Sequence, residues 1–448
     1  MSNSGGVSAR RGEGLYRGPD GGVTYATREI HVRDEEGVAA AVHRALQEQT
    51  RFRTAGSGGS KSDITSQRDC LLHLDQPTDT IEVHGDLVTA PANMTSGRLQ
   101  SLLAPHGLAI PTVGEWQNAT LAGAMVTGTH GGSARYGLMS TSLREMRLVN
   151  GLGDLVTVDS GHPDFQHSGV SLGLMGVITR VTFECIERFS LKLETDVVPF
   201  AEYVRDPVGH ESRSEFHASV WAPEAGRVVR FAADRVAGPP HAISREQRFG
   251  WRTAVATFLS RRLGLHAAVS SAVFRRTVVG DVSDILSPLD LSPRTVRFRV
   301  VANKILPRAV EFAVDAARAS EALSRFQALF RAHPGRLLNP IGLRLTAGDE
   351  FTLSPTLGRH TLWIDVFYYG GEPFVTELAT LAEELGARCH WGKTLPLAPD
   401  VIQRQYPGWD AFRRARERFD PNEVFANSFT DRLGLTGYGS SGTAGSAR

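Results

Sequence analysis

Apolar residues recur along the chain at two spacings, one typical of helices and the other typical of strands. Between Gly37 and Glu48, Val38, Val42 and Leu46 fall on one helical face, and Asp34 precedes them as a candidate N-cap. We expect a further helix around Ser96–Ala104. Longer helical patterns cover Arg245–Leu265 and Pro307–His333.

Short β patterns bounded by turn residues outnumber these helices. The expected strands of the first part of the chain are Val23–Val32, Arg51–Thr54, Leu71–Leu74, Thr80–Val83 and Leu87–Ala90. From about Phe189–Val198 onward, strands alternate with long helical stretches, and the expected strands there are Glu215–Trp221 and Val228–Ala232. Many short strands with few helices predict an α+β fold rather than a doubly wound parallel sheet.

The length of 448 residues is enough for two to three domains of about 150 residues each. Residues 1–22 are rich in Gly, Ser and Arg, and we expect them to be disordered. A first domain is expected over 23–189 and a second over 190–418. Residues 419–433 then return to the first domain, and 434–448 form a flexible tail.

Composition disfavours several classes of partner. With 49 basic and 48 acidic residues the net charge is +1, so no overall field attracts nucleic acid or an anionic membrane. The nearest basic stretch, Arg252–Arg276, interleaves arginines with apolar residues, as amphipathic helices do. Three cysteines make no disulfide framework, and no apolar run reaches the roughly 18 residues of a membrane span. We expect a cytoplasmic protein, because the N-terminus also lacks the apolar core of a signal peptide.

Lysine is rare in this chain. Only Lys61, Lys192, Lys304 and Lys393 occur, so 49 − 4 leaves 45 arginines. With abundant Ala and Gly, this usage is typical of GC-rich bacterial genomes.

Three glycine-rich runs carry the candidate chemistry. The first, Ala55–Ser60, follows a predicted strand, and its glycines let successive backbone N–H groups converge on an anion. It matches neither a Walker loop nor a Rossmann fingerprint, and alone it could be a simple turn. The second run spans Ala119–Gly137 and the third Leu172–Arg180. Tight backbone packing explains each run singly, but three runs in this order and at these separations are hard to assign to chance.

The order of these runs resembles the aldonolactone oxidases of the vanillyl-alcohol-oxidase superfamily, which include gulonolactone, arabinonolactone and alditol oxidases. Ala387–Lys393 is similar to the family's His-Trp-Gly-Lys signature, and Tyr406–Asn427 to its closing segment. Gly342–Arg344 followed by Leu353–Pro355 resembles its substrate-side strand. The resemblance spans roughly residues 25 to 432, and between about 200 and 330 it rests on position and length alone.

The resemblance implies a PCMH-type FAD-binding domain built from 23–189 and 419–433, with 190–418 as a cap whose antiparallel sheet is flanked by helices. It implies O2 or another electron acceptor and a small-molecule substrate. The implied FAD-binding residues are Ala55, Gly56, Ser57, Gly58, Gly59, Ser60, Thr120, Gly123, Ala124, Thr127, Gly128, Thr129, His130, Gly131, Ser133, Val177, Ile178 and Lys393.

The chain departs from the family at its cofactor loop. Most members have a histidine bonded covalently to the flavin where this chain has Gly59, so we expect FAD to be held non-covalently. Some members also use a serine where this chain has Ala124.

The substrate strands depart as well. Members carry Glu-x-Arg where this chain has Gly342 and Arg344, and alditol oxidases have His and Thr where it has Asp365 and Phe367. Alternation along a strand places Trp363, Asp365 and Phe367 on one face. This pocket is more apolar and aromatic than a polyol site. We therefore expect neither xylitol nor a free aldonolactone, but a glycosylated or partly aromatic biosynthetic intermediate.

Three residues are the candidate catalytic groups. Lys393 is expected to offset negative charge on the reduced flavin, although a lone lysine is usually a surface residue. Arg344 is expected to orient substrate, with a salt bridge of the cap as the alternative. Asp365 is the candidate base in place of the missing glutamate, or else a structural acceptor. His130 is assigned to loop geometry and Cys389 to packing.

The reaction predicted from these residues is hydride transfer from a CH–OH or CH–NH group. Epimerisation or desaturation in a biosynthetic pathway, and a flavin-binding homologue without turnover, are the alternatives. The substrate, the electron acceptor and the oligomeric state stay open.

Overall fold

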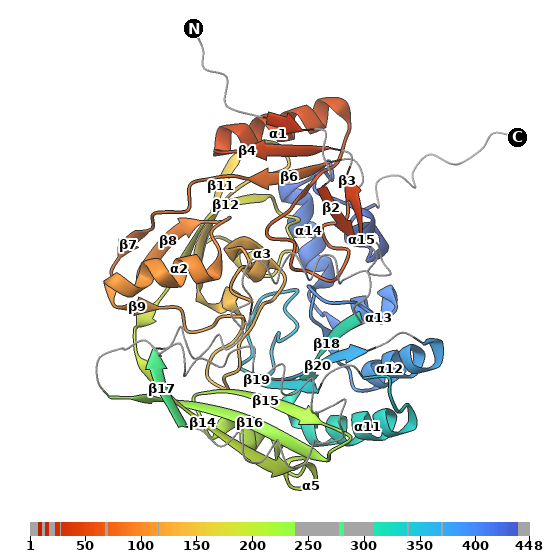
Figure 1. The fold of residues 1–448 in the computed structure, drawn as a ribbon. Coiled ribbons are helices and arrows are strands. Elements are labelled where there is room, and N and C mark those ends of the chain that lie inside the picture. Colours follow the sequence, from red (N-terminus) through yellow and green to blue (C-terminus); the bar gives the residue numbers. More distant parts are fainter. Residues whose placement is uncertain are drawn as a thin grey trace, which may run out of the picture.

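The structure is a computed structural model that describes residues 8–10, 14–17, 23–26, 28–67, 70–114, 116–237, 277–281, 308–337, 340–368 and 371–437. Mixed helices and largely antiparallel sheets confirm the α+β prediction. Figure 1 shows the N-terminal elements at one end of the molecule and the largest sheet at the other.

The N-terminal sheet has the order β1 (Ser8–Arg10), β4 (Glu29–Val32), β6 (Leu71–Leu74), β5 (Arg53–Thr54), and the last three strands are parallel. Asp34 is confirmed as the N-cap, because its side chain accepts a hydrogen bond from the Gly37 N–H at 2.8 Å, and helix α1 (Glu35–Glu48) begins two residues before the predicted Gly37. Its buried residues Val38, Ala41 and Val42 join the core beneath this sheet.

The prediction of disorder over 1–22 is wrong for two segments. β1 pairs antiparallel with β4, and β2 (Gly14–Arg17) forms a hairpin with β3 (Val23–Ala26). Backbone pairing with a neighbouring strand satisfies these residues, and composition alone does not reveal it.

A second sheet is antiparallel and five-stranded. Its order is β11 (Leu155–Asp159), β10 (Leu143–Val149), β12 (Val177–Glu184), β8 (Leu87–Pro91), β7 (Glu82–His84). Between its strands in sequence lie α2 (Ser96–Leu103), η1 (Ala104–His106), β9 (Leu108–Ala109), α3 (Leu121–Val126), η2 (Met139–Ser142) and α4 (Phe165–Ser168). β9 pairs with β13 (Ile186–Glu187).

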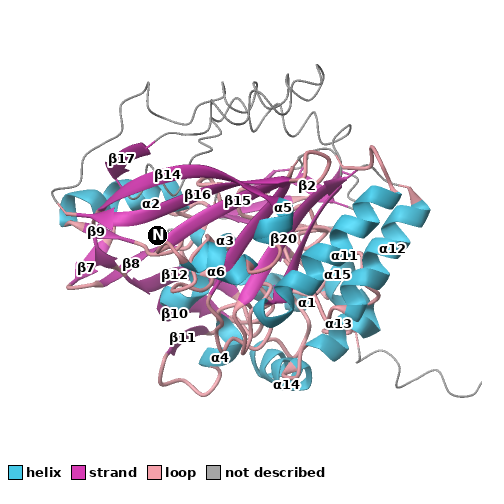
Figure 2. Cartoon of the chain, turned by 90° about the horizontal axis from the view of Figure 1, so that it is seen from below, coloured by secondary structure: helices cyan, strands magenta, loops and turns pink. Residues whose placement is uncertain are grey.

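The largest sheet has eight strands and underlies the candidate substrate side. Its order is β17 (Thr277–Asp281), β14 (Ser190–Pro199), β16 (Arg227–Val236), β15 (Phe216–Ala222), β19 (Ile341–Thr346), β20 (Thr361–Tyr368), β18 (Arg308–Asp315), β21 (Arg388–Cys389). Figure 2 shows β14, β16 and β15 of this sheet side by side, with α11 (Ala319–Ala332) and α12 (Glu372–Glu384) at one end of the molecule. Two short helices, α5 (Phe200–Tyr203) and α6 (Pro207–Ser212), precede β15.

One predicted helix is partly wrong. Of the range Pro307–His333, Arg308–Asp315 forms strand β18, and the helix is confined to η3 (Ala316–Arg318) and α11. Val310, Phe312 and Val314 alternate with Glu311 and Ala313, so the strand buries one apolar face. The predicted helix Arg245–Leu265 and the basic stretch 252–276 lie outside the described residues.

The end of the chain packs against its beginning. After α13 (Pro399–Gln405) and α14 (Trp409–Phe419), Phe419, Val424 and Phe425 enter the same core as α1 and the first two sheets. Figure 1 draws α14 and α15 (Ser428–Arg432) in blue, in the same half of the picture as the red N-terminal elements.

The first residues of the predicted flexible tail, 434–448, are packed against the rest of the chain. Leu435 and Thr436 are buried, and the Thr436 hydroxyl bonds the Thr430 hydroxyl and the Asp431 carboxylate. Residues 438–448 lie outside the described part of the chain. Among the described residues, no helix is long and apolar enough to cross a membrane.

Candidate active site

The first glycine-rich loop offers unused hydrogen-bond donors. Ala55 N–H bonds the Leu72 carbonyl and Lys61 N–H bonds that of Gly392, at 2.9 and 2.7 Å. Within the described part of the chain, the N–H groups from Gly56 to Ser60 donate to no protein acceptor. Gly56 to Gly59 are also exposed, and Gly58 has a φ of +67°. Such a loop can give its N–H groups to an anionic ligand.

Two neighbouring side chains leave no room for larger residues in this loop. A Cβ on Gly56 would lie 2.3 Å from the Thr120 hydroxyl oxygen, and a Cβ on Gly59 would lie 1.7 Å from Cζ3 of Trp116. Thr120 also caps α3, because its hydroxyl accepts from the Gly123 N–H at 3.3 Å. The first and second glycine-rich runs are therefore packed together, as the prediction of a shared site requires.

The turn His390–Lys393 approaches the same loop from the C-terminal side. The His390 N–H donates to the Glu311 carbonyl and the Gly392 N–H to the His390 ring nitrogen Nδ1, each at 2.9 Å. The Ser62 hydroxyl donates to the Trp391 carbonyl at 2.7 Å. These bonds fix the turn between strand β18 and the glycine-rich loop, so the direction of the Lys393 side chain is set by both.

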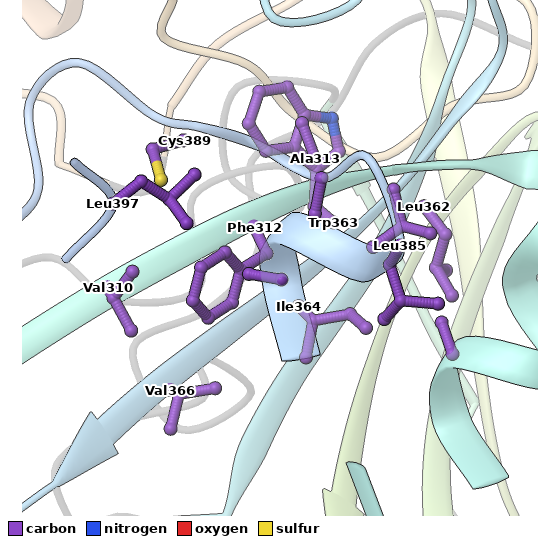
Figure 3. Close-up of a cluster of buried hydrophobic side chains, with 14 of the residues drawn as sticks. Val310, Phe312, Ala313, Leu362, Trp363, Ile364, Val366, Leu385, Cys389 and Leu397 are labelled. Atoms are coloured by element: carbon purple, nitrogen blue, oxygen red, sulfur yellow. The ribbon is translucent and has the colours of Figure 1, made fainter. Parts of the chain in front are cut away.

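Three strands of the large sheet bring the substrate-side residues together. Asp365 on β20 is the register partner of Glu311 on β18 and of Gly342 on β19, so these three positions share one face. The opposite face of β18 and β20 is apolar, and Figure 3 shows Val310, Phe312, Ile364 and Val366 gathered there. The apolar layer holds the strands, and the polar row faces the glycine-rich loops.

Lys393 is bound by two carboxylates. Its Nζ lies 3.1 and 3.2 Å from the two oxygens of Asp365 and 3.5 Å from Glu311. Desolvation alone would lower the pKa of Lys393, but attraction by Asp365 and Glu311 outweighs it and raises that pKa. Lys393 is therefore a largely buried ammonium group, not a solvated surface lysine.

The two carboxylates around Lys393 differ in acidity. Desolvation raises the pKa of Asp365, and repulsion by Glu311 adds to that rise. The pKa of Glu311 would also rise on desolvation, but Lys393 and His130 hold it well below its ordinary value. A pair of acids whose pKa values are pushed apart is typical of sites that separate a base from a permanent counter-ion.

Sequence reasoning missed Glu311. The side chain is buried, and its Oε1 lies 3.2 Å from Nε2 of His130. His130 stacks on Trp363 with ring centroids 3.9 Å apart, and its Nδ1 lies 2.9 Å from the Gly131 carbonyl oxygen. Glu311 fell inside a predicted helix, but the alternation Val-Glu-Phe-Ala-Val was a signal that could have found it.

His390 completes this buried cluster. Burial lowers the pKa of His390 to about 3, so the ring is neutral at pH 7. The oxygen of Glu311 and one nitrogen each of His130 and His390 are close enough together to hold a metal ion. The Lys393 ammonium group already supplies positive charge to Glu311, so we interpret the cluster as an ion-pair network.

Gly342 and Arg344 lie together beside Asp365. A Cβ on Gly342 would stand 3.2 Å from the Arg344 guanidinium and 3.3 Å from the Asp365 Cβ. Desolvation lowers the pKa of Arg344, which nevertheless keeps its charge beside Asp365. The carboxylate of Asp365 is therefore next to the position where the family's glutamate would start.

Phe367 forms the aromatic part of this face. Nζ of Lys61 lies 4.5 Å from the Phe367 ring centroid, and Nζ of Lys393 lies 5.3 Å from it. The predicted substrate residues Gly342, Arg344, Trp363, Asp365 and Phe367 thus all fall in one region with Lys393.

Other predicted cofactor residues are held within the protein. Val177 and Ile178 lie in the core of the five-stranded sheet. The Ser133 hydroxyl donates to the Glu215 carbonyl, and the Thr127 hydroxyl donates to that of Gly123 at 2.8 Å. Ala124 and Gly128 are buried, whereas Gly123, Thr129 and Gly131 are partly exposed. The assignment of Val177 and Ile178 to the FAD site stays a prediction.

These residues fit FAD. The unbonded N–H groups of Gly56 to Ser60 match a pyrophosphate, and the backbone around Thr120–Gly131 is small enough for close approach. Lys393 would then stand near the redox-active ring, as the family resemblance implies. Cys389 is buried with a pKa raised to about 12, which agrees with a packing role.

Comparison with known proteins identifies two matching families. A family described as "D-arabinono-1,4-lactone oxidase" matches residues 181–433, and "FAD binding domain" matches residues 27–159. L-gulonolactone oxidase of Bos taurus is 24% identical over 419 residues, which are 89% of this chain and 93% of the relative. L-gulono-1,4-lactone dehydrogenase of Mycobacterium tuberculosis is 25% identical over 422 residues, covering 90% and 95%.

Solved structures add a likeness of fold. A cholesterol oxidase from Brevibacterium sterolicum superposes with a TM-score of 0.73 at 16% identity, covering 95% of this chain and 97% of that one. With the family match over 27–159, this likeness confirms the predicted PCMH-type FAD-binding fold. At this identity the likeness concerns the fold alone.

Proposed function

Because this chain belongs to the D-arabinono-1,4-lactone oxidase family and is an FAD-dependent oxidoreductase, we propose that it oxidises a CH–OH or CH–NH group of a sugar-like or natural-product intermediate. The observation that carries the proposal is the contact of Asp365 with Lys393 at 3.1 Å, opposite the glycine-rich loop. A base and a fixed cation side by side are what removal of a proton and a hydride from one substrate requires.

The roles follow from the environments of the side chains. Bound FAD supplies the acceptor for the hydride. Asp365 takes the proton of the substrate O–H or N–H group, because its raised pKa makes it the more basic carboxylate. Lys393 keeps its charge and offsets the negative charge that develops beside it. Arg344 orients the substrate from the neighbouring strand.

The proposed substrate is larger and less polar than a free sugar lactone. Gly342 replaces a carboxylate side chain, and Phe367 presents a partly exposed aromatic ring on the same sheet face, whereas Trp363 is fully buried beneath the His130 ring. A site without those hydroxyl-binding groups loses its discrimination for polyols. We propose a glycosylated or partly aromatic intermediate of a biosynthetic pathway, handled by a cytoplasmic enzyme.

We also propose non-covalent attachment of FAD. Position 59 carries no side chain to form a bond, and Trp116 occupies the space where one would lie. Acid precipitation of purified protein should release all of its flavin into the supernatant. Yellow colour retained in the pellet would contradict this assignment.

The division of labour along the chain is part of the proposal. Residues 23–189 and 419–433 bind FAD, and residues 190–418 cover the reactive ring as the cap. The contacts of Phe419, Val424 and Phe425 with the N-terminal core support the joining of the two FAD-binding segments.

Anaerobic mixing with candidate substrates tests the reaction. We expect the flavin absorbance near 450 nm to bleach with an alcohol or amine of the proposed class and not with xylitol. Recovery on admitting air identifies an oxidase, and recovery only with an artificial acceptor identifies a dehydrogenase. If no intermediate of this class bleaches the flavin, the proposal fails and a homologue without turnover is favoured.

A further inference from the structure

We infer that Glu311 is a positioning residue that keeps Lys393 charged while Asp365 changes its protonation state. The inference deepens the proposed function, since it rests on Asp365 acting as the base. It assigns a distinct task to each of the two carboxylates that share the Lys393 ammonium group.

The position of Glu311 on β18 makes this division possible. The residue is register partner of Asp365, with Lys393 at 3.5 Å from its carboxylate and His130 at 3.2 Å. Its side chain is 7% exposed, compared with 15% for that of Asp365. Glu311 thus lies deeper in the site, where the substrate's proton has less access.

Charge balance gives Glu311 its task. When Asp365 accepts a proton it becomes neutral, and Lys393 then loses the counter-ion nearest to it. A buried ammonium group without a counter-ion tends to lose its own proton. Glu311 remains ionised throughout, so Lys393 stays positive at the stage when negative charge develops beside it.

The other charged groups around Glu311 agree with this assignment. His130 approaches from the second glycine-rich loop, His390 and Lys393 from the C-terminal turn, and Asp365 from β20. Arg344 on β19 adds positive charge beside Asp365. Lowering of the Glu311 pKa by Lys393 and His130 has the sign expected of a permanent counter-ion.

The competing explanation is that Glu311 has a purely structural role, and an experiment can distinguish this role from the proposed electrostatic one. The backbone carbonyl of Glu311 accepts from His390 N–H, so the strand and the turn stay joined when only the side chain changes. Glu311→Gln keeps the shape and removes the charge. Glu211→Gln is the matched control, because Glu211 is also buried near the same sheet but bonds Tyr203 and Ser219 away from Lys393.

The experiment measures the midpoint potential of FAD bound to each full-length variant between pH 6 and 10, with chemical reduction and reference dyes. In Glu311→Gln we expect a fall of potential at alkaline pH, caused by loss of the Lys393 proton, centred at least about one pH unit below any such fall in the wild type. In the double variant that also carries Lys393→Met, this fall of potential should be absent. The Glu311→Asp variant keeps a carboxylate, so its potential–pH curve should be close to that of the wild type. The curve of Glu211→Gln should be the same as that of the wild type.

Potential–pH curves of identical shape for wild type and Glu311→Gln overturn the inference. No substrate enters this measurement, so the inference about Glu311 can be confirmed even if the proposed reaction is wrong. Equally, the proposed reaction can be confirmed even if the inference about Glu311 is wrong. If Glu311→Gln does not retain FAD, the inference is tested by thermal unfolding of the FAD-free wild type and the FAD-free variant at several pH values. The pKa of Glu311 lies below its unfolded value, so its charge stabilises the fold at pH 7 and loses that effect in acid. The difference in Tm must therefore stay constant above about pH 4.5 and shrink as the pH falls from there towards the lowered pKa of Glu311 in the folded protein, and a difference that stays constant below about pH 4.5 overturns the inference.

Discussion

Lys393 shows how a residue's chemistry depends on what lies within a few ångströms of it. In a chain with four lysines, this one is held by Asp365 and Glu311 and lies beside Phe367. Its position in the His-Trp-Gly-Lys turn was predictable from the sequence. Its second carboxylate was not, because Glu311 is 82 positions away along the chain.

Loss of Lys393 should affect reduction and leave binding intact. We expect Lys393→Ala to retain FAD but to slow reduction of the flavin by substrate at least about tenfold, since a positioned charge contributes on the order of 3 kcal/mol. Stopped-flow absorbance at 450 nm measures this rate. Lys192→Ala, on the exposed part of β14, is the matched control; reduction kinetics equal to wild type in Lys393→Ala would remove Lys393 from the mechanism.

Asp365 should control the acid limb of the pH profile. Its pKa is raised, so the base is lost as pH falls through a value above that of an ordinary aspartate, and flavin reduction should slow there. Asp365→Asn should abolish that limb and slow reduction about a hundredfold or more.

The role of Asp365 as the base can also be tested by placing a carboxylate on the neighbouring strand β19, where the family has a glutamate. Because the space at Gly342 adjoins Asp365 and Arg344, Asp365→Asn combined with Gly342→Glu should recover part of the lost rate. Rapid-reaction kinetics of both variants make the comparison. No recovery in the double variant, together with a normal acid limb in Asp365→Asn, would assign the base elsewhere.

At the scale of elements, the cofactor loop depends on its contact with α3. Gly56→Ala would place a Cβ 2.3 Å from the Thr120 hydroxyl oxygen, so the loop must move and its N–H groups lose their alignment. We expect FAD to bind at least about tenfold more weakly, measured by fluorescence titration. Thr120→Ala should partly rescue Gly56→Ala, whereas Gly161→Ala, where the added Cβ meets its nearest neighbour at 3.4 Å, should have no effect.

Elements were predictable where local pattern and burial agree. Helix α1 begins at the Asp34 cap and follows its apolar stripe, and strand β6 has the predicted bounds. Strand β18 was mistaken for a helix because the strong helical spacing after Ala319 was extended backwards over it. Pairing with β20 and β21 decides its conformation, and those partners are distant in sequence. The contact of Gly59 with Trp116 was likewise beyond any local pattern.

At the scale of the whole molecule, one buried arginine joins three distant segments. Arg53 donates to the carbonyls of Ile64, Leu172 and Phe425, at 3.1 Å for Ile64 and 2.8 Å for Phe425. Desolvation lowers the pKa of Arg53 to about 10, so it remains charged at pH 7. The residues on either side of the first glycine-rich run, the start of the third run and the C-terminal segment therefore share one anchor.

Removal of this anchor should destabilise the fold. Arg53→Met leaves three buried carbonyls without their donor, and we expect a loss of about 3 kcal/mol or more in the free energy of unfolding. Denaturant titration of the FAD-free protein gives this value. Arg44→Met, which removes an exposed pair with Glu48, should leave the free energy of unfolding almost unchanged; equal losses in both variants would contradict the anchoring role.

The contact between the C-terminal segment and the N-terminal core also has a consequence for folding during synthesis. The ribosome adds Phe425 long after Phe52 and Arg53, and yet Phe425 packs against Phe52 and its carbonyl accepts the Arg53 hydrogen bond beside the cofactor loop. A nascent chain that stops before this segment has the glycine-rich loops without their support. We therefore expect the cofactor loop to reach its final conformation only after synthesis has passed Phe425.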